Sequence, residues 1–381
     1  MEWIAAKLAL GRLGVRPQTL YAYASRGRVQ VRADPADPRR SLYNAADLDA
    51  LIERRRRGRK RAEVAAGAIS WGEPVLDSAI TTIVGGRLFY RGRDAVRLAQ
   101  TESFEAVARL LRGGDGVRPK RMAPAAAPGA GDLRARAFAV LAQRAGSDPP
   151  ALGRNPAALA AEAAGLLDAM AAAVAGAPGE GPIHLRLARA WGADERGADL
   201  IRRALVLMAD HELNASTFAA RVAASTGASL AACVLAGLAA LSGPRHGAAA
   251  AAVRALLTDA ARDGPEAAVA ARLHEDRAIP GFGHPLYPQG DPRAAALLAG
   301  FSPSAAAAAL GRAAQAHTGR APNVDFALVA MTQAIDAPAD ADFGLFAMAR
   351  TAGWIAHALE QVRSGGLIRP RARYVGPEPE A

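Results

Sequence analysis

Cysteine is nearly absent from this chain. Its 381 residues include only Cys233, so an internal disulfide is excluded and the protein is not a small disulfide-stapled scaffold. Cys233 lies within the apolar run "SLAACVLAGLAAL" at 229–241. A thiol in that setting is expected to pack in a core rather than to act as a nucleophile.

Long apolar runs and aromatic residues are also scarce. Aromatic residues make up 5% of the chain. No stretch of about 18 residues is free of both charged and turn-forming residues, so no membrane span is expected. Met1 is followed by a charged, amphipathic segment rather than by an apolar run, which argues against a signal peptide. We therefore expect a cytoplasmic protein, and at this length two or three structural units.

Positive charge is abundant, but it is concentrated at one end. The formal net charge of the chain is +11. Residues 1–62 hold 15 Lys or Arg against 6 Asp or Glu, while residues 63–381 hold 32 against 30. The basic character that favours a nucleic-acid partner is thus a property of the N-terminal segment alone.

The N-terminal segment shows the pattern of a helix-turn-helix. An apolar helical pattern over Ile4–Arg12 is followed by a turn at 13–15, and a second helix begins at Pro17. The stretch "VQVRADPADPRRSLY" at 29–43 suits a small hairpin or wing, and a third helix with Asn44 as its N-cap is expected to follow. Residues 1–62 resemble the MerR-like winged helix-turn-helix modules, whose recognition helix carries a motif similar to "TLYAYASRG".

This resemblance implies binding to duplex DNA. The side chains expected near the groove are Arg16, Gln18, Thr19 and Tyr21, and those expected at phosphates are Arg26, Arg28, Arg39 and Arg40. The alternative is a small helical module for packing or dimerisation, with the basic run at 54–61 as a solvated linker.

The rest of the chain, residues 63–381, is predicted to be mainly α-helical. The stretch "DSAITTIVGGRLFYRG" at 77–92 alternates apolar and polar residues around two adjacent glycines, which predicts one short hairpin. Alanine- and leucine-rich helical patterns follow almost to the C-terminus. Low-complexity breaks at 123–131, 146–153 and 176–182 are interpreted as surface loops between helices.

Three of the seven histidines lie in polar, turn-rich contexts, and these are His211, His246 and His284. His246 immediately precedes a strong helix former, so we expect the helix dipole to disfavour its protonation and leave a neutral ring that donates one hydrogen bond. His284 follows Gly281-Phe282-Gly283, where the glycines permit a positive φ and a close approach of a ligand to backbone N–H groups. The remaining histidines, His184, His274, His317 and His357, are interpreted as ordinary surface or core residues.

Two charged residues lie at the edges of apolar helical patterns. Asp325, in "APNVDFALVAMTQAI", is interpreted either as an N-terminal cap or as a general base whose pKa is set by burial against the helix dipole. Arg350 lies four residues after Phe346 and four before Trp354, so the three share one helix face. An arginine on such a face is expected to have an anion nearby.

The order of several motifs is more specific than any one residue. They are "GGRLFYRGRDAVRLA", "DHELNAST" with "RVAAST", "GPRHG", "PGFGHPLY", "DPRA", "PNVDF", "FAMARTAGWIAHALEQ" and "IRPRARYVG". Together, over about 68–376, they resemble the citrate synthase family.

The family resemblance implies a fold and an activity. The fold would be all-α, with a large subdomain at about 68–247 and 336–381 and a small one at about 248–335 that closes over the first substrate. The activity would be condensation of acetyl-CoA with oxaloacetate and hydrolysis of citryl-CoA, with no metal or redox cofactor. The protein would be a homodimer.

The family resemblance also implies roles for individual residues. Asp325 would remove a proton from the thioester methyl group, His246 would donate to the thioester oxygen, and His284 would donate to the ketone of oxaloacetate. The positions that match oxaloacetate-binding residues are His211, Asn214, Arg293, Arg350 and Arg369, with Arg369 reaching in from the other subunit. Ser216 and Phe346 match supporting positions, and the backbone of Ile279, Pro280, Gly281, Phe282 and Gly283 matches the loop that meets the CoA adenine.

Three departures from the family pattern are visible. Ala250 stands where an Asn is usual, Pro288 stands where a basic residue often helps to bind CoA phosphates, and only 31 residues separate Arg293 from Asp325. The alternatives are a 2-methylcitrate synthase that uses propionyl-CoA, and a DNA-binding regulator whose second domain senses oxaloacetate or acyl-CoA.

Overall fold

The computed structural model describes residues 2–25, 28–52, 76–114, 131–275, 277–372 and 374–377. It divides into two compact units, Met1–Asp77 and Ser78–Ala381, each of which is treated by itself below. Several positions discussed above, namely Arg26, the basic run at 54–61, the predicted boundary at 62/63 and most of the loop at 123–131, lie outside the described residues.

The first unit combines two helices with a small antiparallel sheet. Its elements are β1 (Trp3–Ala5), α1 (Ala6–Leu13), α2 (Pro17–Ser25), β2 (Val31–Asp34) and β3 (Asp37–Asn44), with sheet order β1-β3-β2. The predicted first helix began at Ile4, which was wrong, because Ile4 pairs with Tyr43 of β3 and the helix begins at Ala6. Asn44 accepts a hydrogen bond from the N–H of Ala46 at the start of a helical segment at 45–52, as expected of a cap.

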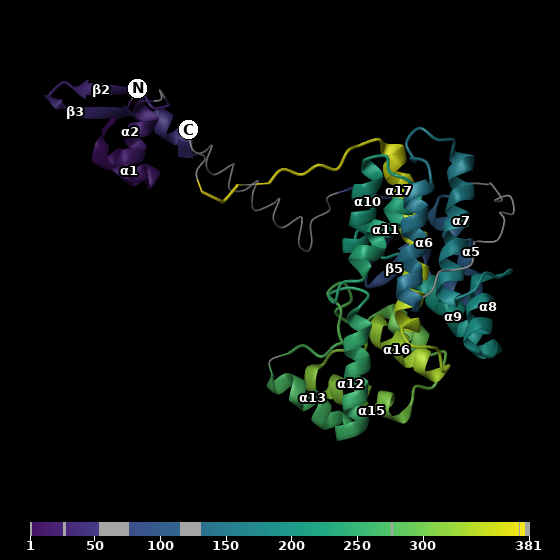
Figure 1. The fold of residues 1–381 in the computed structure, drawn as a ribbon. Coiled ribbons are helices and arrows are strands. Elements are labelled where there is room, and N and C mark those ends of the chain that lie inside the picture. Colours follow the sequence, from purple (N-terminus) through teal and green to yellow (C-terminus); the bar gives the residue numbers. More distant parts are fainter. Residues whose placement is uncertain are drawn as a thin grey trace. The chain divides into compact units, whose positions relative to one another are not determined.

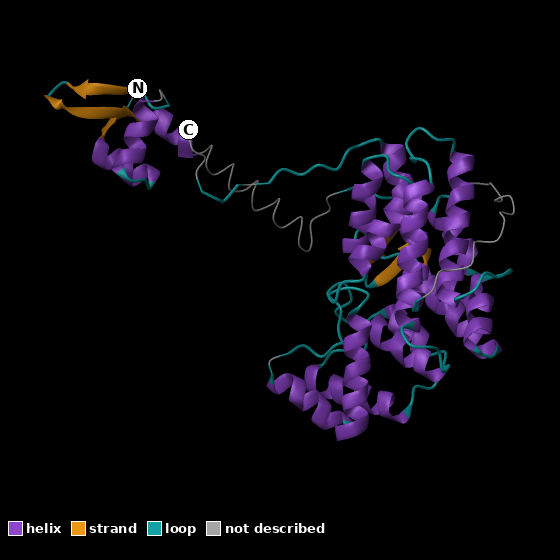
Figure 2. Ribbon diagram, in the orientation of Figure 1, coloured by secondary structure: helices purple, strands orange, loops and turns teal. Residues whose placement is uncertain are grey.

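The second unit is mainly helical (Figures 1 and 2). It opens with a sheet of order β4-β5-β6 formed by β4 (Thr81–Val84), β5 (Arg87–Tyr90) and β6 (Arg93–Asp94). The predicted hairpin is confirmed, because β4 and β5 pair through a turn whose residues Gly85 and Gly86 both have positive φ. The helices of the first part are α4 (Ala95–Thr101), α5 (Phe104–Leu111), α6 (Leu133–Ser147), α7 (Pro156–Ala175), α8 (Ile183–Trp191), α9 (Glu195–Leu207), α10 (Ala215–Ser225) and α11 (Leu230–Leu241).

The second half of this unit continues with helices. They are α12 (Ala249–Asp263), α13 (Pro265–His274), α14 (Pro292–Leu298), α15 (Ala305–Thr318), α16 (Val324–Ala334) and α17 (Ala341–Ser364). Helix α12 packs against α13, α15 and α16, and α14 packs against α16, so these five form one cluster, drawn in green and yellow-green in Figure 1. Where the predicted small subdomain begins and ends stays a prediction.

Helix α17 is the central element of the unit. It is buried along most of its length, because it packs against α5, α6, α7, α9, α10 and α11. At its start, Arg254 of α12 forms ion pairs with Asp340, at 2.7 Å, and with Asp342. Helix α17 therefore connects these helices with the cluster formed by α12 to α16.

Helix α7 is long and apolar enough to cross a membrane by composition alone, but 72% of its apolar window is buried inside the protein. It packs against α6, α8, α11 and α17. This is the environment of a core helix.

Candidate active site

The site is assembled by four segments of the second unit. They are the 208–216 segment that leads into α10, the 243–248 turn before α12, the 279–293 loop that leads into α14, and the start of α16, and helix α17 lies behind them. His211 is buried, its ring contacts that of His284, and the charges of Arg293, Arg350, His284 and His246 all help to lower its pKa. The structure thus brings together most of the predicted residues.

His246 lies in the turn before α12, three residues ahead of the first helical residue, Ala249. Its Nε2 is 2.8 Å from the Oγ of Ser216, and its ring makes an edge contact with Phe346 at 5.8 Å between centroids. Burial, with a contribution from the charge of Arg350, lowers the pKa of His246 to about 4. The lowered pKa agrees with the predicted neutral ring, and its causes are desolvation, first, and the charge of Arg350.

The hydroxyl of Ser216 lies between the side chains of Asn214 and His246. Its Oγ is 2.7 Å from Asn214 Oδ1 and 2.8 Å from His246 Nε2, and it accepts a hydrogen bond from Trp354 Nε1 at 3.1 Å. A hydroxyl carries one proton. When that proton goes to Asn214, His246 must hold its own proton on Nε2, and when it turns to His246, the imidazole proton resides on Nδ1.

The loop that contains His284 is held by backbone pairing with the segment before α16. Gly281 and Gly283 have φ values of 87° and 75°, which confirms the predicted need for glycine. The N–H of Gly283 donates to Ala321 O at 2.8 Å, and Asn323 N–H donates to Gly281 O at 2.8 Å. The Gly283 N–H is therefore occupied within the chain, so the expectation of free N–H groups along this loop is wrong at that residue.

The protonation state of His284 follows from its neighbours. The N–H of Leu286 donates to His284 Nδ1 at 3.2 Å, so Nδ1 is an acceptor and the proton of a neutral ring is on Nε2. Burial and the charge of Arg293 lower the pKa of His284 to about 4, although Asp291 opposes this. The ring is thus a neutral donor through Nε2.

His211 contacts Tyr287 as well as His284. Its Nε2 lies 3.0 Å from the Oη of Tyr287, and its ring meets that of His284 edge-on at 5.2 Å between centroids. Burial and the surrounding cations hold the pKa of His211 well below its usual value. A neutral imidazole is therefore favoured at this position, and its role in binding oxaloacetate stays a prediction.

Arg293 is buried and paired at the start of α14. Its Nε and Nη2 donate to the two carboxylate oxygens of Asp291 at 2.9 and 2.8 Å. Asp291 Oδ2 also accepts the N–H of Val324 at 3.1 Å, which ties α14 to the start of α16. The guanidinium lies over the ring of Tyr287, 5.3 Å from its centroid.

Arg350 is 1% exposed. Its Nε donates to Met208 O at 3.1 Å, and its guanidinium carbon is 5.1 Å from the Phe346 ring centroid. No described side chain forms an ion pair with it, although the charge of nearby Asp210 favours its protonated form. Burial nevertheless lowers the pKa of Arg350 to about 10. The guanidinium of Arg350 can therefore bind an anion.

Asp325 is the second residue of α16, and it is not the helix cap. The cap is Asn323, whose Oδ1 accepts the N–H groups of Asp325 and Phe326. The cap interpretation of Asp325 is therefore wrong. Burial raises the pKa of its carboxyl to about 6, and the charges of Asp291 and Asp342 add to the rise while Arg293 and Arg350 oppose it. A carboxylate in such a setting is suited to act as a general base near neutral pH.

Two predicted ligand-binding residues differ from the rest. Asn214 uses its side chain as the cap of α10, accepting from the N–H groups of Ser216 and Thr217 while its Nδ2 donates to His211 O. Arg369 is exposed and lies in the extended segment that follows α17. Within one chain it contacts none of the residues above.

Sequence reasoning missed three further residues. Tyr287 and Asp291 belong to the same loop as His284, and the signal for Asp291 was its place directly before a proline at the start of a helix, which is typical of a cap. Asp210, next to His211, is fully buried. A charged residue within an apolar stretch was the signal for it.

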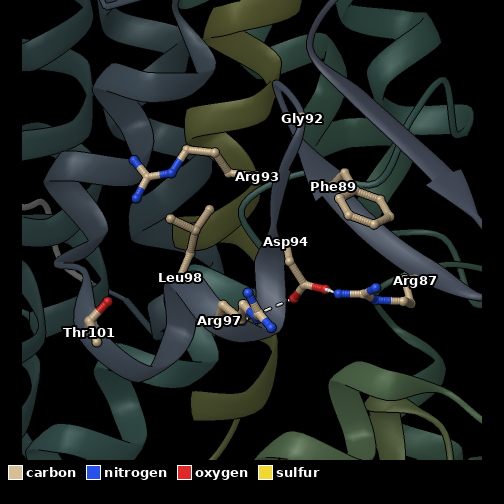
Figure 3. A pocket seen from close by; sticks show the side chains of 8 residues that line it. All are labelled: Arg87, Phe89, Gly92, Arg93, Asp94, Arg97, Leu98 and Thr101. Carbon is tan, nitrogen blue, oxygen red and sulfur yellow. Dashed lines mark hydrogen bonds and ion pairs between the residues drawn. The ribbon is translucent and has the colours of Figure 1, made fainter.

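A separate hollow of about 370 Å³ lies on the hairpin and α4 (Figure 3). It is lined by Arg87, Phe89, Gly92, Arg93, Asp94, Arg97, Leu98 and Thr101. Arg87 is paired with Asp94, and Arg93 with Glu102. None of the lining residues belongs to the cluster around His211. In the described part of the chain, no group of three or more His, Cys, Asp or Glu side chains could hold a metal ion.

Comparisons with known sequences agree with this arrangement. The family model for the citrate synthase C-terminal domain matches residues 133–371. Citrate synthase 2 of Bacillus subtilis is 37% identical over 191 residues, which cover 47% of this chain and 51% of the relative. A 2-methylcitrate synthase of Corynebacterium glutamicum is 36% identical over 189 residues, covering 46% and 49%. The chain thus spans about half the length of the curated relatives it matches.

Solved structures match over a larger share. Citrate synthase from Thermotoga maritima superposes with a TM-score of 0.68 at 28% identity, covering 81% of this chain and 96% of that one. Citrate synthase from Thermoplasma acidophilum was solved as a ternary complex with carboxymethyl coenzyme A and oxaloacetate. It superposes with a TM-score of 0.66 at 27% identity, covering 81% of this chain and 95% of that one.

Proposed function

The chain belongs to the citrate synthase family, and we propose that it condenses acetyl-CoA with oxaloacetate and hydrolyses the citryl-CoA that forms. The observation that carries the proposal is the combination of one carboxyl with a raised pKa, Asp325, and two neutral histidines, His246 and His284, around buried arginines. At neutral pH, the carboxylate can accept a proton while the two neutral histidines donate hydrogen bonds.

In the first step, Asp325 takes a proton from the methyl group of acetyl-CoA. The electron pair moves toward the thioester oxygen, which receives a hydrogen bond from His246 Nδ1–H. This requires the Ser216 hydroxyl to turn its proton toward His246 Nε2, at the 2.8 Å distance that separates the two atoms. The neutral ring of His246 is already a hydrogen-bond donor before the substrate binds. The enol is therefore stabilised by a preorganised donor.

In the second step, the enol carbon attacks the ketone carbon of oxaloacetate. The carbon–carbon bond forms as the C=O π bond breaks, and the alkoxide oxygen takes the Nε2 proton of His284, the tautomer that the Leu286 contact favours. The proton released as the enol becomes a thioester carbonyl again returns to the site, so His284 is reprotonated with no net change. Water then cleaves the thioester, giving citrate and free CoA. Overall, acetyl-CoA, oxaloacetate and water give citrate, CoA thiol and one proton, with no net oxidation or reduction.

The charges at the site support a second subunit as a contributor. Arg293 forms an ion pair with Asp291, whereas Arg350 has no ion-pair partner among the described side chains. Oxaloacetate is a dianion, so one chain leaves it without full compensation. Arg369, exposed after α17, supplies the missing cation to the site of a partner copy, and the protein acts as a homodimer.

For CoA, the proposed contact is the loop at 279–283. Because Gly283 N–H is already bonded to Ala321 O, CoA would contact the other backbone groups of this loop.

We assign the protein to the cytoplasm.

The test is release of CoA thiol from acetyl-CoA, measured with a thiol reagent with and without oxaloacetate. We expect release only when oxaloacetate is present, and none from Asp325→Ala. An absence of thiol release from both acetyl-CoA and propionyl-CoA at high concentration would overturn the enzymatic function and leave a sensor domain as the better account.

A second candidate activity is the synthesis of 2-methylcitrate. It is favoured by the similarity to a 2-methylcitrate synthase, at 36% identity, and it needs the same residues. Comparing kcat/KM for acetyl-CoA and propionyl-CoA decides between them, since the larger value identifies the preferred acyl group.

For the first unit we propose duplex DNA as the partner. The support is its charge, 15 basic against 6 acidic residues over 1–62, together with its helix, turn, helix and hairpin order and the 60% exposure of Tyr21 on α2. Affinity should fall steeply with salt and vanish when residues 1–62 are deleted. Absent or salt-independent binding would leave this unit a packing or dimerisation module.

A further inference from the structure

Three consecutive residues, 208–210, run along one face of α17 and are bonded to it at three points. Met208 O accepts from Arg350 Nε at 3.1 Å. Ala209 O accepts from the backbone N–H of Gly353 at 3.0 Å. The Asp210 carboxylate lies 3.2 Å from His357 Nε2. We call this set of three contacts the α17 ladder.

The spacing of the ladder matches the helix repeat. Residues 350, 353 and 357 fall on one face of a helix, three and four residues apart. At the middle contact no side chain fits, because a Cβ on Gly353 would lie 2.3 Å from Asp210 Oδ1 and 2.6 Å from Ala209 O. The close approach of the 208–210 segment to α17 therefore depends on glycine at this position.

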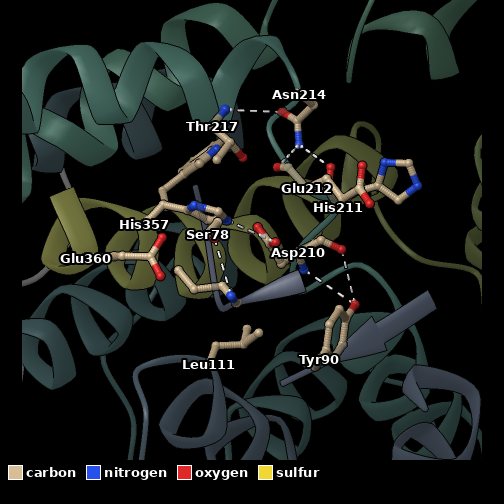
Figure 4. Close-up of polar contacts among 12 residues, drawn as sticks. Ser78, Tyr90, Leu111, Asp210, His211, Glu212, Asn214, Thr217, His357 and Glu360 are labelled. Atoms are coloured by element: carbon tan, nitrogen blue, oxygen red, sulfur yellow. Dashed lines mark hydrogen bonds and ion pairs between the residues drawn. The ribbon is translucent and has the colours of Figure 1, made fainter. Parts of the chain in front are cut away.

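The other side of the segment is held by the hairpin. Tyr90 of β5 places its Oη within 3.2 Å of the carbonyl oxygen of Asp210 and within 3.4 Å of its N–H, as Figure 4 shows. The 208–210 segment is thus enclosed between β5 and α17. The next residue is His211, which points into the site.

The last contact of the ladder joins two buried, titratable groups. Asp210 and His357 have side chains that are 0% and 1% exposed, and Figure 4 shows them pointing toward one another. Among the described residues, Asp210 Oδ1 and His357 Nδ1 make no hydrogen bond of good geometry, although the hydroxyl of Thr81 is close enough to the Asp210 carboxyl to help lower its pKa. Burying polar groups that are only half satisfied is unfavourable, so a packed apolar pair would serve stability better. A role beyond stability explains their presence.

That role follows from what the segment connects. One end of the ladder is Arg350 and the residue after the other end is His211, and both belong to the anion-binding set. We propose that His357 is a positioning residue, which through Asp210 holds the 208–211 segment on α17 so that His211 and Arg350 keep the spacing that binds the substrate dianion. The proposal rests on the proposed function for the identity of that dianion, oxaloacetate.

Two polar substitutions at His357 provide the test. The amide nitrogen of His357→Gln reaches the place of Nε2, whereas that of His357→Asn corresponds to Nδ1 and is too short to reach Asp210. We expect His357→Asn to raise KM for oxaloacetate tenfold or more, while KM for acetyl-CoA changes less than twofold. His357→Gln should keep KM for oxaloacetate within threefold of the unsubstituted protein.

A matched control and a direct binding measurement accompany the kinetics. Thr351→Val removes a buried hydroxyl on the same helix that bonds only to Ala347 O within α17, and it should leave both KM values within twofold. Oxaloacetate affinity measured by calorimetry on the full chain should follow KM across the variants. This readout does not require turnover.

The outcomes separate the two proposals. Unsubstituted protein that binds oxaloacetate but makes no citrate overturns the proposed function and leaves the His357 comparison valid by affinity. Equal oxaloacetate affinity in the Gln and Asn variants overturns the positioning role, whether both match the unsubstituted protein or both are weakened alike. A rise in both KM values with Asn also overturns it, since that is the mark of general damage.

Discussion

Asp291 binds the guanidinium of Arg293 through two nearly parallel hydrogen bonds of 2.9 and 2.8 Å, and both side chains are buried. The same carboxylate accepts the N–H of Val324, the neighbour of Asp325. One acidic side chain therefore connects the residue proposed to bind a substrate carboxylate with the residue proposed as base. The distance between the two is set before any ligand arrives.

Asp291→Asn should destabilise the protein and make its stability depend more strongly on bound oxaloacetate. Removing one partner of a buried charge pair leaves the other uncompensated, which lowers the free energy of unfolding by about 3 kcal/mol. Oxaloacetate should restore more stability to this variant than to the unsubstituted protein, because a substrate carboxylate replaces the missing charge on Arg293. Melting curves with and without oxaloacetate measure both effects, and equal melting temperatures in its absence would contradict the role of the pair.

The pH dependence of the reaction should show a single acidic limb. The pKa of Asp325 is raised to about 6 and those of His246 and His284 are lowered to about 4. The base must be ionised to accept a proton, so kcat/KM for oxaloacetate should rise as the pH increases through about 6 and then remain level while both histidines stay neutral. A profile measured at constant ionic strength that instead rises toward acid would exclude Asp325 as the base.

Asp325→Asn should abolish activity and increase stability. A pKa of about 6 in the folded protein, above the ordinary 3.8, means that the native carboxyl holds its proton more tightly than the unfolded one. Stability is therefore lost as the pH rises from about 4 to about 6, and by about 2 kcal/mol after allowance for partial exposure. The amide variant avoids this loss. Denaturant unfolding should show the gain at pH 7 and none near pH 3.5, whereas a loss at pH 7 would contradict the assignment.

Ser216→Ala should lower kcat by about tenfold or more with little change in KM for oxaloacetate. Without the hydroxyl, nothing donates to His246 Nε2, so the ring is no longer held in the tautomer that presents Nδ1–H. Ser225→Ala is the matched control, since its hydroxyl on the same helix bonds only to Val222 O. If the two variants have the same kcat, the Ser216 contact has no part in the reaction.

Gly353→Ala should lower stability strongly, by about 3 kcal/mol or more, because its Cβ would meet two oxygens at distances no packed structure allows. Gly311→Ala on α15 is the control. A Cβ there meets only the Phe326 ring, at 3.8 Å, so this change should be neutral or stabilising by up to about 1 kcal/mol. Similar melting temperatures for the two variants would show that the 208–210 segment moves away from α17 easily.

The sequence predicted the mainly helical class, the hairpin at Gly85-Gly86 and the glycines of the His284 loop, because each depends on local rules of periodicity or φ. Local turn and charge signals pointed to His246, His284, Asp325 and Arg350, but each also had an ordinary structural interpretation. The order of the motifs, through the family resemblance, gave these residues their roles and added Arg293.

What the sequence did not indicate depends on contacts between distant segments. The lowered pKa of His246 follows from burial and from Arg350, which is more than a hundred residues away in the sequence. His357 was interpreted as an ordinary core residue, since nothing in "GWIAHALEQ" points to Asp210. The occupied N–H of Gly283 likewise required the pairing with Ala321, which no local pattern predicts.

The amide of Gly353 has a further consequence for measurement. Inside a long helix, exchange of a backbone proton with deuterated water ordinarily reports opening of the helix itself. This amide also donates to Ala209 O, which lies outside the helix. Its exchange therefore requires the 208–210 segment to separate from α17, so the exchange rate of this one amide reports on the contact between the segment and the helix.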